Sequence, residues 1–432
     1  MHDISEEPGT VICVCGSEGF PRGFGGTARI TLIGKSLQAA GLKFHVLHCG
    51  PSPLPENTQK SGIHEGISFE YMTSMLKPKD KSMRSLAYAR AVVNLAFKLI
   101  GLRAAGKRFT VYLYVQSGPL NLIASMLCQA LGISLVQEMC EWWATDMRFS
   151  SLTRWLFRSR MFKASTGLLV ISKEIEQRAQ ERAAMLNPRL TIHRLPSVVD
   201  FDRFCAPVAP QQPGETHMPN FVWCGSIDGW MADVKFMMAA LAHARLTHAC
   251  QLTLVGGYSE VNAAIIKKEA AALGLVVTEP RDRSVAYGDP SAGDVRLAGW
   301  VDLETLQACF RNAAALLLPL FDDERSRTRM PNKLPEYLAS SKPVITSKVG
   351  DLQDFLVDGV NASLAKPGDS VDFACSMTAL LADPELATRI GTAGQQTCAQ
   401  NLDYRAHVAC LAEFFGNCLR KPAHLRAEGI SP

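Results

Sequence analysis

The sequence has little excess charge of either sign and lacks the cysteine spacing of a metal or redox site. Its 45 Lys and Arg residues oppose 41 Asp and Glu residues, and the net charge of +4 is too small to indicate nucleic-acid binding by itself. None of the 13 cysteines forms a Cys-x-x-Cys pair, and an odd number cannot pair completely within the chain. Because cysteines such as Cys13 and Cys128 stand singly in apolar runs, we expect reduced, buried thiols.

Signals for secretion and for a bound metal are also missing. The chain begins Met-His-Asp-Ile-Ser-Glu-Glu-Pro, without a cationic leader before an apolar core, so we expect no signal peptide and a cytoplasmic protein. The ten histidines show no ligand spacing, and Asp200-Phe-Asp202 is an isolated acidic pair. We therefore predict no metal and no bound cofactor.

One uncharged run, 109–137, is long enough to suggest a membrane span. Gly118-Pro119 and Gly132 interrupt it, however, and divide it into segments with the lengths of a strand, a helix and a second strand. We predict that this run is a buried part of an α/β domain.

The order of apolar and amphipathic segments indicates two domains. Short runs rich in Val, Ile and Leu alternate with amphipathic stretches, which is typical of parallel sheets covered by helices on both faces. The pattern stops at a segment rich in Pro, Gln and Gly and then restarts. The predicted fold class is α/β, with two doubly wound Rossmann-like domains facing across a cleft. The predicted divisions are an N-terminal domain 1–205, a linker 206–220, a C-terminal domain 221–403, and a C-terminal helix 404–420 that packs back onto the first domain.

The stretch that begins Met330-Pro-Asn-Lys-Leu-Pro-Glu carries the most informative chemistry. Pro335 is tolerated only in the first turn of a helix, so a helix should begin near Asn332 or Lys333. Free backbone N–H groups and the Lys333 ammonium would then meet at one end and favour an anion. Glu336 could accept hydrogen bonds from a pair of sugar hydroxyls, so a nucleoside diphosphate fits this arrangement.

A glycine-rich loop follows the first predicted strand. Gly23-Phe-Gly-Gly-Thr-Ala28 satisfies the G-x-G-x-x-A pattern of dinucleotide sites. About eight residues separate the strand from the pattern, and His45-Val-Leu-His-Cys49 ends without the acidic residue that would bind a ribose. We favour a loop in which Gly25 and Gly26 close over a nucleotide sugar or an acceptor. A flexible turn and a dinucleotide site remain open.

Several motifs occur together in a recognisable order. They are Gly25-Gly26 with Arg29, Gly167-Leu-Leu-Val-Ile-Ser172, Leu195-Pro-Ser-Val-Val-Asp200, Phe221-Val-Trp-Cys-Gly225, Leu254-Val-Gly256, Leu297-Ala-Gly-Trp-Val301, Leu317-Leu-Pro319, the stretch from Met330, Asp358-Gly-Val-Asn361 and Pro367-Gly-Asp369. Together they cover nearly the whole chain. The sequence thus resembles the family-4 glycosyltransferases of the GT-B fold.

The resemblance implies transfer of a sugar from a nucleotide-sugar donor to a glycan, lipid-linked or small-molecule acceptor, usually with retention and without a bound metal. It places the donor mainly on the C-terminal domain. Glu336 matches the family's second glutamate, expected on the ribose, while Asn332 and Lys333 face the diphosphate. Gly25 and Gly26 match the N-terminal loop, and Gly225 and Ser226 match the first C-terminal strand end. The expected catalytic residues are Lys333 first, then Lys235 and Arg327.

The sequence departs from the family at three places. Thr328 stands where the first glutamate is expected, and Asp322, Asp323 or Glu324 could replace it. Ser226 stands where the family often has Arg, and the next lysine is Lys235; the missing charge could come from Arg325, Arg327 or Arg329, although such a run is also typical of a solvated face. Ser341 replaces a common Gly, and a left-handed backbone there would cost roughly 1 kcal/mol.

The acceptor side is less defined. Glu138 and Glu141 follow a predicted strand and could bind or deprotonate an acceptor hydroxyl. The basic, aromatic-containing segments 84–108 and 148–163 could lie on the inner face of a membrane, or could simply cover the sheet. Three other functions stay open: a GT-B sugar-nucleotide epimerase, an inactive nucleotide-binding scaffold, and an NAD-dependent oxidoreductase.

Overall fold

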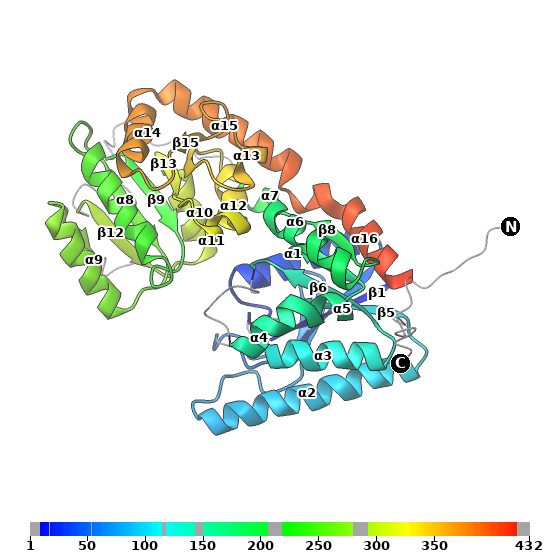
Figure 1. Ribbon diagram of the computed structural model, residues 1–432. Helices are drawn as coiled ribbons and strands as arrows, with labels where there is room; N and C mark the ends of the chain where they lie inside the picture. Colours follow the sequence, from blue (N-terminus) through cyan, green and yellow to red (C-terminus); the bar gives the residue numbers. More distant parts are fainter. Residues whose placement is uncertain are drawn as a thin grey trace. The chain divides into compact units, whose positions relative to one another are not determined.

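The computed structural model describes residues 9–16, 18–52, 54–114, 118–142, 150–205, 218–279 and 293–420. The chain forms two compact units (Figure 1). The N-terminal unit comprises residues up to Val198 and again from Tyr404, and the C-terminal unit comprises Val199–Asp403. The first division thus comes before the predicted linker, of which residues 206–217 lie outside the described residues.

An eight-stranded sheet forms the centre of the N-terminal unit. Its strand order is β3-β4-β2-β1-β5-β6-β7-β8, and every neighbouring pair is parallel except the β3–β4 hairpin. From β1 the chain builds outward through β2 and β4, and it then builds the other half from β5. The strands are β1 Thr10–Cys15, β2 Lys43–His48, β3 Ser61–His64, β4 Ile67–Tyr71, β5 Phe109–Tyr114, β6 Ser134–Met139, β7 Gly167–Val170 and β8 Thr191–Arg194.

Helices cover this sheet because its central strands are apolar on both faces. All six residues of β5 and all six of β6 are buried, and the run 109–137 is indeed strand, helix and strand, as predicted. The helical segments are α1 Gly25–Ala39, α2 Lys81–Ala104, α3 Gly118–Ala130, α4 Ser151–Trp155, the π-helical turn η1 Leu156–Arg160, α5 Met161–Ala164 and α6 Lys173–Leu186.

Residues 404–420 belong to the N-terminal unit. The predicted helix 404–420 consists of the 3₁₀ turn η3 Tyr404–His407 and the helix α16 Val408–Arg420. The Ser36 hydroxyl of α1 donates to the Tyr404 carbonyl at 3.1 Å, and Ser134 donates to the Cys418 carbonyl at 2.7 Å. Phe415 packs edge-on against Tyr112, with 5.7 Å between ring centroids.

The C-terminal unit contains a seven-stranded parallel sheet with the order β11-β12-β10-β9-β13-β14-β15. The strands are β9 Asn220–Cys224, β10 Gln251–Val255, β11 Val277–Thr278, β12 Val295–Gly299, β13 Ala315–Leu318, β14 Val344–Ser347 and β15 Ser363–Ala365. The helices are α7 Phe201–Phe204, α8 Met231–Ala244, α9 Glu260–Ala272, α10 Leu303–Arg311, α11 Glu324–Thr328, α12 Lys333–Ala339, α13 Leu352–Phe355, α14 Ser370–Ala382 and α15 Pro384–Asn401.

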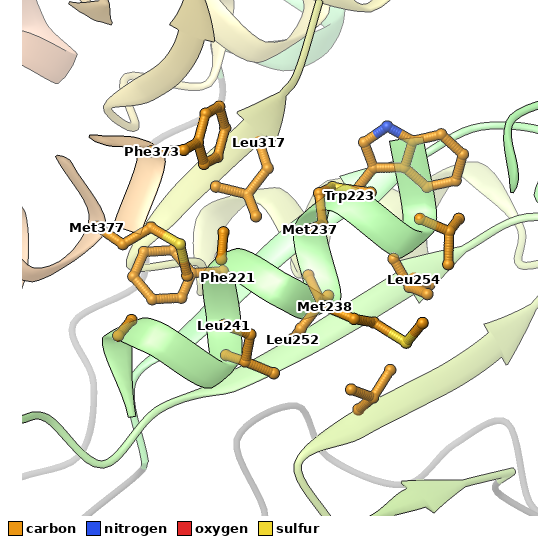
Figure 2. Close-up of a cluster of buried hydrophobic side chains, with 14 of the residues drawn as sticks. Phe221, Trp223, Met237, Met238, Leu241, Leu252, Leu254, Leu317, Phe373 and Met377 are labelled. Carbon is orange, nitrogen blue, oxygen red and sulfur yellow. The ribbon is translucent and has the colours of Figure 1, made fainter. Parts of the chain in front are cut away.

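Apolar side chains from four elements join this sheet to its helices (Figure 2). Phe221 and Trp223 of β9 and Leu317 of β13 meet Met237 of α8 and Phe373 of α14, and all five are buried. Since β9 lies at the centre of the sheet and contributes to this core along its length, its carboxyl end is held in a fixed position. That end carries the candidate site.

Candidate functional site

The strand order of the C-terminal unit predicts where a ligand binds. From β9 the chain first builds one half of the sheet, through β10, β11 and β12. It then returns to the other side of β9 and builds β13, β14 and β15. The direction therefore reverses between β9 and β13, and ligands of open α/β sheets bind beyond the carboxyl ends of the strands at such a switch point. The segments there are Gly225–Trp230 after β9 and 319–332 after β13.

The turn after β9 is closely packed and requires glycine. A Cβ atom at Gly225 would lie 2.6 Å from the Trp223 ring, and one at Gly256 would lie 1.8 Å from the Gly225 carbonyl oxygen. Gly256 also has a φ of 140°, which favours glycine. Ser226 next to this turn is exposed. The predicted donor residues Gly225 and Ser226 thus lie at the switch point.

Asp228 fixes the other end of this turn. Its carboxylate accepts hydrogen bonds from the Ser259 amide at 2.9 Å and from the Asn262 side chain at 2.7 Å. Together with the Ser259 hydroxyl, these bonds hold the pKa of Asp228 below its ordinary value. The turn is therefore tied to the start of α9 and presents its backbone in one conformation.

Helix α12 begins at Lys333, as predicted, with Asn332 as the preceding residue. The Asn332 side chain makes no capping hydrogen bond to the helix. The Lys333 Nζ contacts Oε2 of Glu336 at 3.0 Å, and the two side chains are 31% and 20% exposed. Burial would lower the pKa of Lys333, but the Glu336 carboxylate and the Cys224 thiol outweigh burial and raise it. Lys333 is therefore a permanent cation with contact to solvent.

Tyr337 fixes α12 against β9. Its buried hydroxyl accepts a hydrogen bond from the Cys224 amide at 2.7 Å, and burial raises the pKa of this phenol well above its ordinary value. Burial also raises the pKa of the Cys224 thiol, although the neighbouring Lys333 ammonium opposes that change. The start of α12 consequently lies at the carboxyl end of β9, beside Gly225.

Two arginines of the β13–α12 segment stack on the tryptophan that precedes α8. The guanidinium carbons of Arg325 and Arg329 lie 3.9 and 4.2 Å from the centroid of the Trp230 ring. This cation–π contact holds both arginines at the switch point. Beside them, burial raises the pKa of Asp233 to about 6, although Arg329 and Arg325 act to lower it.

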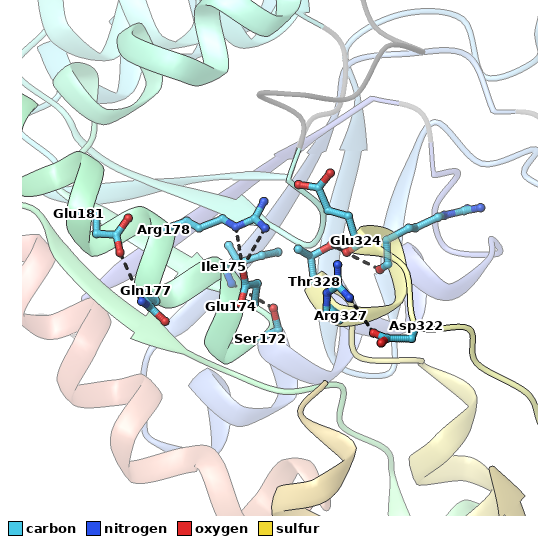
Figure 3. A network of polar contacts seen from close by, with 11 residues as sticks. Ser172, Glu174, Ile175, Gln177, Arg178, Glu181, Asp322, Glu324, Arg327 and Thr328 are labelled. Carbon is cyan, nitrogen blue, oxygen red and sulfur yellow. Dashed lines mark hydrogen bonds and ion pairs between the residues drawn. The ribbon is translucent and has the colours of Figure 1, made fainter. Parts of the chain in front are cut away.

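The remaining residues of α11 make local contacts (Figure 3). Arg327 forms an ion pair with Asp322 at 2.6 Å, and both side chains are largely exposed. The Thr328 hydroxyl is buried and donates to the Glu324 carbonyl at 2.9 Å. Asp323 caps α11 through the Ser326 amide. None of these contacts identifies a replacement for the glutamate expected at Thr328.

Lys235 lies on α8 and reaches a neighbouring helix. Its Nζ contacts Oε1 of Glu269 on α9 at 2.7 Å, and the two side chains are 46% and 44% exposed. The structure therefore pairs Lys235 with a carboxylate on the helical layer, whereas Arg325 and Arg329 hold the positive charge next to Trp230. The roles predicted for Lys235 and Arg327 in catalysis stay predictions.

In the N-terminal unit the switch point lies between β1 and β5, and the glycine loop follows β1. Gly25 and Gly26 open α1, and a Cβ atom at Gly26 would lie 2.4 Å from Oε2 of Glu18. The Thr27 hydroxyl donates to the Gly19 carbonyl at 2.8 Å, which closes the loop on itself. The predicted loop residues are thus held in a compact turn at the carboxyl edge of this sheet.

Glu138 has a different position from the one expected of an acceptor-binding base. Its carboxylate is only 3% exposed and contacts the Arg29 guanidinium at 2.9 Å. It also accepts a hydrogen bond from the Tyr112 hydroxyl, and Arg29 donates to the carbonyls of Leu195 and Pro196 at 2.9 and 2.8 Å. These bonds occupy the carboxylate inside the unit and join β6 to α1. The acceptor role of Glu138 stays a prediction.

Glu141 lies two residues after β6 and is partly buried. Its role as an acceptor residue stays a prediction, since residues 143–149 after it lie outside the described residues.

Among the residues that the structure describes, no group of three or more His, Cys, Asp and Glu side chains could hold a metal ion.

Sequence reasoning missed the contact of Trp230 with two arginines. It named Arg325 and Arg329 as possible sources of charge but had no means of pairing them with a tryptophan almost a hundred residues earlier. The only available signal was the alternation Arg325-Ser-Arg327-Thr-Arg329 next to a helix start. It also missed Tyr337, whose hydroxyl joins α12 to β9.

Comparison with known proteins gives a match for most of the C-terminal unit. Residues 218–383 match the sequence family described as glycosyl transferases group 1, and this segment contains the switch-point residues of the C-terminal unit. Over 243 residues, the chain is 25% identical to D-inositol 3-phosphate glycosyltransferase of Xylanimonas cellulosilytica. That alignment covers 54% of this chain and only 53% of the relative, about half of its length.

Solved structures are similar over almost the entire chain. Sucrose-phosphate synthase from Thermosynechococcus elongatus has a TM-score of 0.67 at 16% identity, covering 94% of this chain and 98% of that one. A glycosyltransferase from Rickettsia africae has a TM-score of 0.67 at 15% identity, covering 96% and 100%. Anabaena HepE in complex with UDP and glucose has a TM-score of 0.66 at 14% identity, covering 95% and 99%.

The sequence match and the fold thus agree with the resemblance that the motifs indicated. Residues 218–383 match the group 1 glycosyl transferases, and the chain as a whole has the GT-B fold.

Proposed function

We propose that this protein transfers a sugar from a nucleotide-sugar donor to an acceptor hydroxyl, and that the donor binds at the switch point of the C-terminal unit. The observation that carries the proposal is the grouping of Lys333, Glu336, Arg325 and Arg329 beyond the ends of β9 and β13. These residues lie within the segment that matches the glycosyl transferases.

Similar structures support the choice of donor. Anabaena HepE was solved with UDP and with UDP-glucose, and its fold is similar to that of this chain. We therefore expect a nucleoside diphosphate sugar here as well. The base and the sugar stay open, as does the choice among glycan, lipid-linked and small-molecule acceptors.

The chemistry requires charge to be stabilised on the leaving group. The bond between the sugar C1 and the β-phosphate oxygen breaks, a bond from C1 to the acceptor oxygen forms, and the acceptor proton is released. Negative charge therefore grows on the diphosphate, where preorganised cations are most effective. Lys333, Arg325 and Arg329 are suited to this task because each places a cationic side chain at the switch point.

Glu336 is suited to the ribose. One of its oxygens already contacts Lys333, and the carboxylate retains acceptor capacity for a pair of hydroxyl donors. The Lys333 ammonium likewise has three donors, of which Glu336 uses one. The ion pair can thus persist while each partner binds a different part of the nucleotide.

We also propose that the reaction retains the configuration at C1 and uses no bound metal. The cationic side chains would then carry the leaving-group charge by themselves. Turnover should be unchanged after treatment with EDTA, and NMR of the first-formed product should show the anomeric configuration of the donor. Loss of turnover on chelation, restored by a divalent cation, would overturn the metal-independent part of the proposal.

A thermal-shift panel of UDP, GDP, ADP and their sugars tests donor binding. A ligand that binds only the folded protein at about 100 times its Kd should stabilise it by roughly 2.7 kcal/mol. We expect one base to stabilise the protein clearly more than the others. The donor so identified is then incubated with and without candidate acceptors, and release of the free nucleoside diphosphate is measured.

The same assays separate the alternatives. An epimerase would convert the sugar nucleotide without an acceptor, and an inactive scaffold would bind nucleotide without releasing sugar. An oxidoreductase would instead be stabilised by NADH and not by sugar nucleotides. Any of these three results would overturn the proposed transferase activity.

A further inference from the structure

Helix α2 of the N-terminal unit has two apolar faces. Four of its residues are buried at a spacing of four, which defines the face packed on the sheet: Ala87, Ala91, Leu95 and Leu99. Ala91, Leu95 and Leu99 belong to a core that also includes Ile12 of β1 and Val111 of β5. Packing on the sheet therefore explains why this side of α2 is apolar.

The opposite face of α2 is apolar as well. Leu86, Val93, Phe97 and Ile100 follow one another at spacings of seven, four and three residues, which places them on one side of a helix. Their exposed fractions are 61%, 51%, 71% and 45%. These four residues, here called the outer stripe, form an apolar row about four turns long that nothing in the described structure covers.

The charged residues of α2 and of the turn after it are all basic. Residues 81–108 include no Asp or Glu, and they include seven basic residues: Lys81, Arg84, Arg90, Lys98, Arg103, Lys107 and Arg108. By helical spacing Arg90 and Arg103 lie on the two flanks of the outer stripe. An apolar row between cations complements a surface that offers both hydrocarbon and negative charge.

The helix is attached to the unit along its length. The Asn94 side chain donates to the Met72 carbonyl at 2.8 Å, and the Lys98 Nζ contacts Glu70 at 2.7 Å. By length and composition alone, α2 could cross a membrane. Crossing would require these bonds and the buried face to separate from the sheet, whereas lying on a surface requires no rearrangement. Figure 1 shows α2 along the outside of its unit, beside α3.

We propose that α2 docks the protein on an anionic lipid bilayer, with the outer stripe inserted at the level of the headgroups and the basic residues on the lipid phosphates. Shallow insertion of an apolar face beside Lys and Arg is the binding mode of interfacial helices. A second copy of the chain fits the surface less well, because it would bring the basic flanks at Arg90 and Arg103 against the same residues of the other copy.

The second basic segment named from the sequence, 148–163, offers a smaller apolar surface for a membrane than α2 does. Phe157 and Phe162 within 150–163 are buried in the unit, and Trp155 and Leu152 are its exposed large apolar residues. Residues 148 and 149 lie outside the described residues. The proposal is therefore confined to α2, and it does not depend on the transferase activity.

Vesicle flotation tests the proposal with the full chain and without any sugar donor. Vesicles of phosphatidylcholine mixed with an equal amount of phosphatidylglycerol should carry the protein, whereas vesicles of pure phosphatidylcholine should carry much less. The double variant Leu86→Ser/Phe97→Ser should bind the anionic vesicles more than about tenfold more weakly, because two large apolar groups are lost. Arg90→Glu/Arg103→Glu should reduce binding by about tenfold or more, and high salt should act in the same direction.

Matched changes on the other unit control for general effects. Leu246 and Val261 are 81% and 70% exposed, so Leu246→Ser/Val261→Ser removes two apolar side chains of comparable exposure. This variant should float like the original protein, as should Lys268→Glu. Melting curves confirm folding, and since the altered side chains are exposed, all variants should melt within a few degrees of the original protein.

A substitution that retains binding gives a second measurement. The fluorescence of Phe97→Trp should shift to the blue with anionic vesicles, and brominated lipids should quench it. Flotation that the outer-stripe and charge variants do not alter would overturn the proposal, as would an absence of binding to anionic vesicles. A dimer in sedimentation analysis that Leu86→Ser/Phe97→Ser converts to a monomer would also overturn the proposal. It would show that a second copy of the chain covers the outer stripe.

Discussion

The Lys333 ammonium lies 3.0 Å from the Glu336 carboxylate, one turn apart at the start of α12. Tyr337, the next residue, fixes this turn against the end of β9. The pair thus presents one cation and one carboxylate side by side at the switch point of the sheet. A nucleoside diphosphate needs both, because its phosphates are anionic and its ribose offers hydroxyl donors.

Removing the Lys333 charge should impair turnover. Lys333→Ala should lower kcat by ~10²-fold or more, because a preorganised cation no longer meets the charge on the leaving diphosphate. Steady-state kinetics with the identified donor measure the effect. Lys267→Ala is the control, since Lys267 forms an exposed ion pair with Glu279 at 2.8 Å and has no proposed role in the site. Full turnover in a folded Lys333→Ala protein would remove Lys333 from the site.

The two arginines on Trp230 should contribute to nucleotide affinity. Arg325→Ala and Arg329→Ala should each weaken binding of the nucleoside diphosphate by about tenfold, the usual loss for a hydrogen bond to a charged group. Arg329→Lys should not restore it, because an ammonium does not reproduce the stacked planar guanidinium. Titration calorimetry measures the affinities, with the exposed Arg389→Ala as control. If all four variants bound the nucleoside diphosphate with equal affinity, the two arginines on Trp230 would stabilise the fold without contacting the nucleotide.

Breaking the Arg29–Glu138 pair should destabilise the protein. Glu138→Gln leaves a buried guanidinium without its countercharge and should cost about 3–5 kcal/mol of unfolding free energy. Denaturant unfolding measures this loss. Glu174→Gln removes a surface pair with Arg178 at 2.8 Å (Figure 3) and should cost less than about 1 kcal/mol. Similar losses in the two variants would contradict the assigned role of Glu138.

Ser341 provides a test of backbone strain. Its φ of 61° confirms the left-handed conformation considered from the sequence, and glycine adopts this region without a Cβ clash. Ser341→Gly should therefore raise the unfolding free energy by roughly 1 kcal/mol. Ser340→Gly, one residue earlier at a φ of −73°, should not stabilise the protein. A gain at position 340 rather than 341 would contradict the assignment of strain.

Asp233 should produce a pH dependence of stability. Its pKa in the folded protein is raised from 3.8 to about 6, so the folded state binds a proton more tightly than the unfolded state. The contribution of Asp233 to the free energy of unfolding is fully present below about pH 4 and is lost as the pH rises through about 6. Asp233→Asn should remove this decline, which we expect to reach about 3 kcal/mol at most. Unfolding curves from pH 4 to 7 that stay parallel for the two proteins would contradict the shift.

The sequence predicted the strands of both sheets well where an apolar run alone decides the structure. The run 109–137, for example, was predicted to be strand, helix and strand, and it forms β5, α3 and β6. It did not predict the β3–β4 hairpin, because Ser61–His64 and Ile67–Tyr71 are short, partly polar and only partly buried. The start of α12 was predictable because Pro335 is tolerated only in the first turn of a helix.

The contacts that define the sites were not predictable in the same way. Arg29 and Glu138 are 109 residues apart, and only the fold shows that they meet inside the unit. The sequence analysis placed Glu138 after a strand, whereas the structure buries it within β6. Trp230 likewise meets Arg325 and Arg329 only because β9 and β13 are neighbours. Local patterns locate candidate residues, and long-range pairing decides which of them face a ligand.

Hydrogen exchange with and without nucleotide tests the location of the donor site most directly. With the nucleoside diphosphate that stabilises the protein best, we predict slower exchange in peptides that cover 225–230 and 325–337, and this protection should weaken in Lys333→Ala. Protection confined to other segments of the C-terminal unit or to the N-terminal unit, with these two unchanged, would contradict the proposed site.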